Sequence, residues 1–111
     1  MYRGRENRKT AQYLSEHGAA CIIVVYGHSL APVTDRAGAV VAKPLTADKT
    51  VKVGDLVFCR LHGHYRIQKV RYIKENEHYA VGNTRGYVHG TIGREDIYGR
   101  VVKVFRNKTR E

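Results

Sequence analysis

The pattern that most restricts the fold is a series of short apolar segments, rich in β-branched residues, that recur roughly every ten residues between turn-forming residues. Residues 20–26 (ACIIVVY) are continuously apolar, as expected of a strand buried on both faces. Further strands are expected at residues 39–45, 55–61, 65–74, 78–82 and 97–105. Residues 83–93 are rich in Gly and predict a loop. The chain should therefore be mainly β, with a small curled mixed or antiparallel sheet, or a partly open barrel.

The N-terminal segment has a different character. Residues 5–17 contain no Gly or Pro and are followed by Gly18, which predicts one short helix or a frayed arm. A length of 111 residues suits a single small domain. We therefore expect a basic N-terminal helix or arm (1–18), one β-rich domain (19–105) and a charged tail (106–111).

Charge and cysteine content narrow the range of partners. The chain has 20 Lys and Arg against 10 Asp and Glu, a net charge of +10, which favours acidic proteins or nucleic acid as partners. Cys21 and Cys59 lie in separate apolar runs and indicate buried, reduced thiols rather than a disulfide framework or a zinc site. His62 and His64 flank Gly63 in a segment that predicts a tight turn, so no metal or other cofactor is expected.

No segment predicts a membrane span. The longest apolar run is far shorter than the roughly 20 residues that a spanning helix needs. The N-terminal residues are basic but lack the apolar core of a signal peptide. The expected location is the cytoplasm.

One loop carries a candidate nucleophile. Ser29 follows Gly27 and His28 and precedes Pro32, at the end of the first apolar run. A serine hydroxyl needs a base within hydrogen-bond reach and donors for the oxyanion, and backbone N–H groups beside Ser29 could serve as donors. Taken alone, these residue types are also typical of an ordinary turn.

The order of the later segments gives this loop a context. GHSLAP resembles the G-x-S-M-x-P box of the serine peptidase superfamily that includes signal peptidase and LexA, with Leu30 in place of Met. VKVGDLVFCRL, YRIQKVRYI, AVGN with the following Gly86, and DIYGRVV resemble the family's later segments in the same order. The similarity spans roughly residues 20–104 and is greatest to small phage-encoded proteins described as signal-peptidase-like, which implies a host cytoplasm.

The resemblance implies a role for specific positions. Ser29 matches the nucleophile, and Gln68 matches the general base, which in the family is Lys or His. The Asp of the family's Gly-Asp-Asn box matches Asn83. The residues implied in binding are Gly27, Leu30, Pro32, Asn83, Arg66 and Arg71.

The base position departs from the family pattern, because the amide of Gln68 is not a useful proton acceptor near pH 7. Three interpretations follow. Hydrolysis has been lost and Gln68 hydrogen-bonds to Ser29; or a bulge at Gln68 and Lys69 re-aims Lys69 as the base, with Arg66 and Arg71 lowering its pKa. In the third, a histidine supplies the base: His28, or one of His62, His64 and His89.

These interpretations give three functional hypotheses. The first is a signal-peptidase/LexA-like domain with a degenerate site, which holds an extended peptide by strand addition or binds an acidic protein. The second is an active serine endopeptidase that uses Ser29 with Lys69 or a His as base. The third is a basic, nucleic-acid-binding β-barrel.

Overall fold

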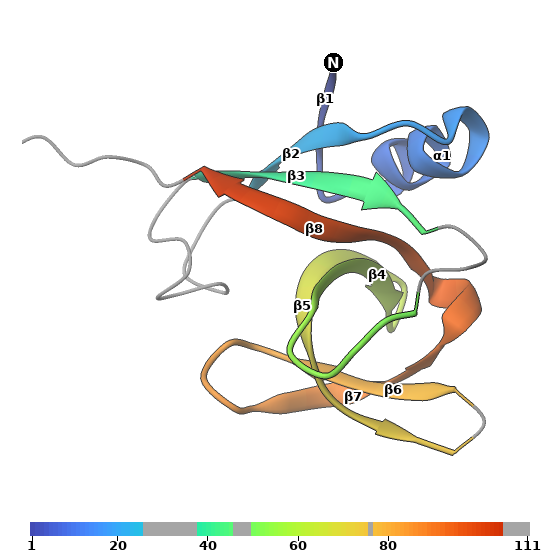
Figure 1. Cartoon of the computed structure of the whole chain (residues 1–111), viewed down its shortest axis with the longest axis vertical. Coiled ribbons are helices and arrows are strands. Elements are labelled where there is room, and N and C mark those ends of the chain that lie inside the picture. The colour runs from blue at the N-terminus through green and yellow to red at the C-terminus, as the bar shows by residue number, and fades with distance from the viewer. Residues whose placement is uncertain (26–37, 46–49, 76, 106–111) are drawn as a thin grey trace, which may run out of the picture.

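The computed structural model describes residues 1–25, 38–45, 50–75 and 77–105. Its elements in chain order are β1 (Tyr2–Arg5), α1 (Arg8–His17), β2 (Cys21–Val25), β3 (Gly38–Pro44), β4 (Leu56–Leu61), β5 (His64–Lys74), β6 (His78–Gly82), β7 (Val88–Gly93), the short 3₁₀ helix η1 (Arg94–Asp96) and β8 (Ile97–Phe105). The prediction of a mainly β fold with one N-terminal helix is confirmed (Figure 1).

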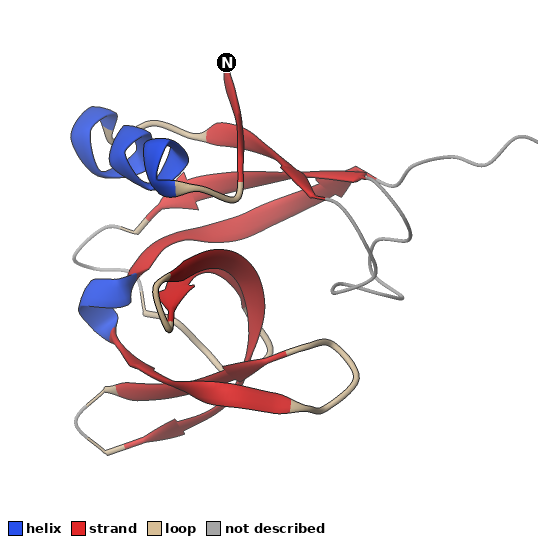
Figure 2. Cartoon of the chain, turned by 180° about the vertical axis from the view of Figure 1, so that it is seen from behind, coloured by secondary structure: helices blue, strands red, loops and turns tan. Residues whose placement is uncertain are grey.

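The eight strands form one mixed sheet in the order β1-β2-β3-β8-β4-β5-β6-β7. Only β1 and β2 are parallel, and all the other neighbouring strands are antiparallel. The sheet is strongly curled, and Figure 2 shows α1 lying over one end of it. The sheet is not closed, because β1 and β7 remain its two edges.

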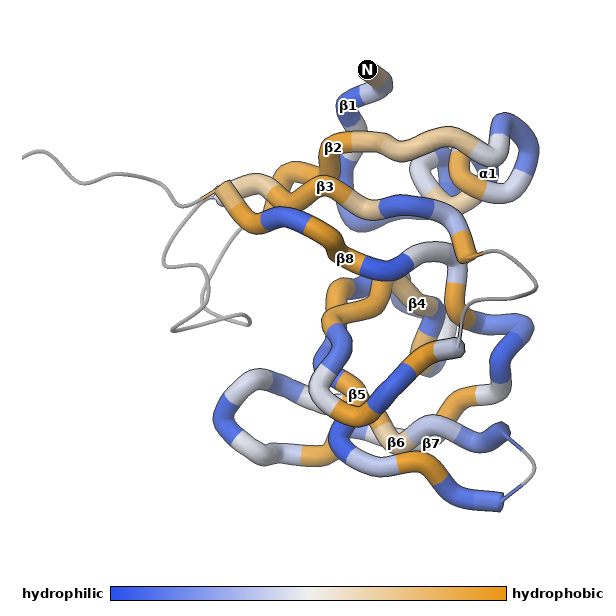
Figure 3. The backbone as a smooth tube through the Cα atoms, in the orientation of Figure 1, coloured by the Kyte–Doolittle hydropathy of each residue, from blue (hydrophilic) through white to orange (hydrophobic). Residues whose placement is uncertain are grey.

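Two apolar cores lie on opposite faces of β4. The helix-side core consists of Ala11, Leu14, Cys21, Ile23, Val25, Val40, Ala42, Phe58 and Ile67. The hairpin-side core consists of Val51, Val57, Cys59, Leu61, Val70, Tyr79, Val81, Ile92 and Ile97. Strand β4 is therefore buried on both faces, with Phe58 in one core and Cys59 in the other. Figure 3 shows apolar colouring along β2 and hydrophilic residues in the turn between β6 and β7.

Helix α1 is fixed at both ends by its caps. The side chain of Asn7 accepts a hydrogen bond from the Thr10 backbone N–H at 3.1 Å, and Gly18 ends the helix in the left-handed conformation. Thr10, Ala11 and Leu14 form its buried face. The helix predicted over residues 5–17 is present, but it begins only after Asn7 because the preceding residues form β1.

The N-terminal segment also contacts β5 directly. Among the described strands, the first half of β5 pairs only with β4, which leaves part of its backbone edge open. The Ile67 backbone N–H on this edge donates to Glu6 Oε1 at 2.9 Å. The pKa of Glu6 is raised, because burial outweighs the opposing effects of this hydrogen bond and of the nearby Arg66. One carboxylate thus joins the segment between β1 and α1 to the interior strand β5.

Strand β7 corrects the expectation of a loop over residues 83–93. The glycines that indicated a loop stand within or beside a strand, where atoms of neighbouring residues lie too close to leave room for a side chain. A Cβ built on Gly90 would lie 2.9 Å from Leu61 Cδ1. Strand β1 was not expected at all.

Candidate functional site

The nucleophile loop of the predicted site falls on residues 26–37, which lie outside the described part of the chain. Its predicted residues are Gly27, His28, Ser29, Leu30 and Pro32. Val25 and Gly38, on either side of this segment, are paired in the sheet. The described part of the candidate site therefore consists of residues on β5 and in the hairpin formed by β6 and β7.

Gln68, the residue predicted to stand at a base position, is only 6% exposed. It lies opposite Val57 in the pairing of β4 with β5, on the face of β5 that carries Val70 of the hairpin-side core. Its Oε1 atom lies 3.0 Å from Nδ1 of His89 on β7. In the tautomer that donates Nδ1–H to this oxygen, Nε2 of the ring keeps its lone pair.

Lys69 lies on the other face of β5 from Gln68. The pairing of β4 with β5 is continuous from His64 to Lys69, so neighbouring side chains alternate between faces. Lys69 is opposite Leu56 on β4 and Gly82 on β6, and it is partly buried. The expectation of a bulge at Gln68 and Lys69 is therefore wrong.

Two register shifts lie on either side of β6 instead. On β5 the shift falls between Val70 and Tyr72, which leaves Arg71 as the extra residue. On β7 the residue left without a partner is His89, between Val88 and Gly90. Bulges of this kind redirect side chains and are common beside functional sites. They set Arg71 and His89 on the two strands that flank the end of β6.

The turn that joins β6 and β7 is held by Asn83. Its Oδ1 atom accepts hydrogen bonds from the backbone N–H groups of Arg85, at 2.9 Å, and Tyr87, at 3.0 Å. The Asn83 backbone N–H donates to the Tyr87 carbonyl at 3.0 Å. A Cβ on Gly82 would collide with that same carbonyl group. Asn83, predicted as a binding residue, is thus the residue that shapes the turn.

Arg66 and Arg71 lie in different surroundings. Arg66 is exposed, donates to the Tyr65 carbonyl at 3.3 Å, and acts electrostatically on Glu6. Arg71 is partly buried, and a Cβ on Gly86 would lie 3.4 Å from its Nη2 atom. Of the predicted binding residues, the structure therefore places Arg71 and Asn83 in one area, together with Gln68 and His89.

The sequence predicted His89 only as one of several loop histidines that could supply a base. Its contact with Gln68 depends on the strand character of residues 88–93, which the glycines concealed. A sequence signal does exist, because Val88 and Ile92 are β-branched residues of one strand.

The thiols and the other histidines form no further site in the described residues. Burial raises the pKa of Cys21 to about 11 and that of Cys59 to about 12, so both are protonated at neutral pH and poor metal ligands. His62 and Gly63 both have positive φ in the tight turn between β4 and β5, as predicted. Within residues 1–25, 38–45, 50–75 and 77–105, no group of three or more His, Cys, Asp or Glu side chains could hold a metal ion.

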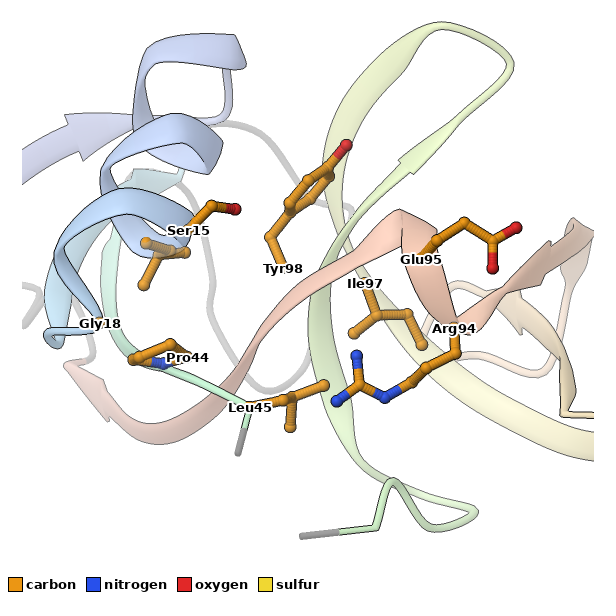
Figure 4. Close-up of a pocket in the computed structure, with 9 residues that line it drawn as sticks. Ser15, Gly18, Pro44, Leu45, Arg94, Glu95, Ile97 and Tyr98 are labelled. Carbon is orange, nitrogen blue, oxygen red and sulfur yellow. The ribbon is translucent and has the colours of Figure 1, made fainter. Parts of the chain in front are cut away.

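A shallow pocket of about 270 Å³ lies elsewhere, between α1 and η1. It is lined by Leu14, Ser15, Gly18, Pro44, Leu45, Arg94, Glu95, Ile97 and Tyr98. Figure 4 shows the Arg94 guanidinium directed toward Leu45 and the Glu95 carboxylate pointing away from it. None of the predicted site residues lines this pocket, so its position does not support the predicted chemistry.

No family model matches the sequence, and no curated protein shows significant similarity to it. No helix in the described part of the chain is long and apolar enough to cross a membrane.

Proposed function

We propose that this chain is a signal-peptidase/LexA-like domain that has lost peptide hydrolysis and binds an extended peptide. The observation that carries the proposal is Gln68. It stands where the family has a base, it is buried, and its amide oxygen is occupied by His89 at 3.0 Å. An amide in this position orients a neighbour but does not accept a proton from a serine.

The position of Lys69 supports the same conclusion. Lys69 and Gln68 point to opposite faces of β5, because the pairing with β4 is regular at both residues. A serine placed to meet Gln68 would therefore not meet Lys69.

Peptide binding is supported by the backbone of β5. Residues 64–68 pair with β4 on one side and with no described strand on the other. Such an edge can take an extended peptide as an additional strand once the Glu6 carboxylate leaves the Ile67 N–H, and main-chain hydrogen bonds then supply much of the affinity. The exposed Arg66 on this segment favours a peptide with acidic residues.

A serine-reactive fluorophosphonate probe tests the loss of hydrolysis. The wild-type protein should not be labelled at Ser29 between about pH 6 and 10, because no general base activates the hydroxyl. Gln68→Lys should restore labelling, and Gln68→Lys combined with Ser29→Ala is the matched control that should remain unlabelled. Labelling of wild-type Ser29 would contradict the proposal.

An active serine endopeptidase is the second candidate, and His89 is the observation that favours it. Gln68 accepts its Nδ1–H, which leaves Nε2 as a proton acceptor. Sites with a nucleophile, a His and an amide arrange the ring in the same way. This candidate predicts labelling of wild-type Ser29 that His89→Ala abolishes and Lys69→Ala leaves intact. The same labelling experiment therefore separates the two candidates.

A further inference from the structure

The strands β4, β5, β6 and β7 carry no acidic side chain. No Asp or Glu occurs in residues 56–74 or 78–94, whereas these residues include seven cations: Arg60, Arg66, Lys69, Arg71, Lys74, Arg85 and Arg94. Glu77 and Glu95 lie beside the pairing of His78 with Gly93, at one end of the β6–β7 hairpin. The opposite end is the turn over residues 83–87, which contains Arg85 and no acidic residue (Figure 1).

Arg71 adds a second cation to this end of the hairpin. It is the extra residue of the β5 bulge, and its guanidinium lies beside Gly86 in the turn. Neither Arg71 nor Arg85 forms an ion pair with any described carboxylate. The carboxylate of Asp55, whose backbone bonds to Val70, instead accepts from the Lys52 N–H at 2.8 Å. Two guanidinium groups are therefore available for an anionic ligand.

An exposed aromatic ring completes this surface. Tyr87 is 67% exposed, although it stands in a turn whose backbone is fixed by Asn83. Its ring meets the ring of His89 edge-on, with centroids 5.4 Å apart and an interplanar angle of 66°. Because Gln68 fixes His89 in turn, the Tyr87 ring is presented to solvent by a supported turn rather than by a free loop.

We propose that Arg71, Arg85, Tyr87 and His89, here called the hairpin-turn surface, bind single-stranded nucleic acid. The two guanidinium groups would contact phosphates, and the Tyr87 ring would stack on a base. An acidic peptide would use the same positive charges but would have no use for an exposed ring, and the ring therefore decides between the two partners. The proposal does not depend on Ser29 or on peptide binding.

The test is fluorescence anisotropy of labelled oligo-dT and oligo-U of roughly 12 nucleotides, a length within the range that one small β-domain covers. Tyr87→Ala should weaken binding roughly tenfold, as expected for the loss of one stacked base, whereas Tyr87→Phe should bind within about twofold of wild type. Arg85→Ala should weaken binding at low salt and reduce the slope of log Kd against log salt by about one. Lys9→Ala on α1 removes the same charge elsewhere and should change binding by less than about twofold.

Several outcomes would overturn the proposal. These are an absence of oligonucleotide binding at about 50 mM salt, wild-type affinity in Tyr87→Ala, or equal loss in Lys9→Ala and Arg85→Ala. A poly-glutamate peptide that competes as well as unlabelled oligo-dT would assign the surface to acidic peptides instead. Arg85 and Tyr87 are exposed, so their variants should fold, and an unchanged circular dichroism spectrum verifies this. Ser29→Ala should bind oligonucleotide like wild type, so failure here is distinguishable from failure of the peptidase-like assignment.

Discussion

The helix-side and hairpin-side cores share strand β4 but differ in what surrounds them. The helix-side core is covered by α1, and its one buried polar side chain among the described residues is Thr10, which donates to Asn7 within the same helix cap. Next to the hairpin-side core, buried Gln68 faces His89, register shifts flank β6, and the strands β4–β7 carry no carboxylate. The interior of the first region is thus almost entirely apolar, whereas polar side chains and irregular strand pairing gather beside the second.

The largest effect should come from the residue of β4 that faces the helix-side core. Phe58→Ala should lower the free energy of unfolding by about 3–5 kcal/mol, because a fully buried aromatic side chain leaves a cavity. Cys59→Ala, one residue along and facing the hairpin-side core, removes a single sulfur atom and should cost about 1 kcal/mol. Urea unfolding measures both changes. Equal losses would contradict the expectation that the larger truncation leaves the larger cavity.

The next effect concerns the hairpin. Gly82→Ala should cost about 1–3 kcal/mol, because the new Cβ would collide with the backbone carbonyl of Tyr87, which is fixed by Asn83. Gly90→Ala is the matched control. Its Cβ would meet the end of the Leu61 side chain, which can rotate away, so the loss should be smaller. Thermal unfolding of both variants makes the comparison, and a larger loss for Gly90→Ala would contradict the assigned role of Gly82.

The strands that sequence analysis located are those with uninterrupted apolar or alternating patterns. Residues 78–82 and 97–105 were predicted with the observed bounds, because β-branched and aromatic residues dominate them. Strands β1 and β7 were missed for a common reason. Each is an edge strand that contains glycine, and a side chain of another element lies close to that glycine. Packing of this kind depends on residues far away in the sequence.

The candidate site was predictable only in part. The resemblance to the peptidase family selected Gln68 and Asn83, and the structure places both beside the β6–β7 hairpin. The bulge was expected two or three residues before its observed position at Arg71. The alternation of apolar residues changes sides between Ile67 and Tyr72, and the sequence does not show at which residue. The contact of Gln68 with His89 depends on register between β5, β6 and β7, which no local pattern specifies.

Two asparagines accept backbone hydrogen bonds in the two regions, Asn7 at the N-cap of α1 and Asn83 in the β6–β7 turn. Asn7→Ala should lower the free energy of unfolding by about 1 kcal/mol, because the N-cap of α1 loses its acceptor for Thr10. Asn83→Ala removes the acceptor for two N–H groups in an exposed turn, where water can replace it, so the global loss should be smaller. Amide hydrogen exchange should instead accelerate at Tyr87. Unchanged exchange there would contradict the view that Asn83 fixes the hairpin-turn surface.

The smallest effect concerns Glu6, which connects the N-terminal segment with β5. It should appear mainly as a pH dependence of the free energy of unfolding. Because the pKa of Glu6 is raised in the folded protein, the folded state holds this proton more tightly than the unfolded chain does. The resulting stabilisation is complete below the ordinary glutamate pKa of about 4.3 and is lost as the pH rises through the raised value. Glu6→Gln keeps an oxygen acceptor for the Ile67 N–H but cannot ionise.

The stability of wild type relative to Glu6→Gln should therefore fall as the pH rises from about 4.3 toward neutral, by less than about 1 kcal/mol for a partly exposed group. Urea unfolding of both proteins across this range measures the difference. Glu6→Ala also removes the acceptor and should be less stable than Glu6→Gln at every pH, because the Ile67 N–H then loses its partner. A wild-type advantage that grows with pH would mean that the charged carboxylate stabilises the contact, and that the N-terminal segment is held on β5 by the Arg66 charge rather than by a desolvated hydrogen bond.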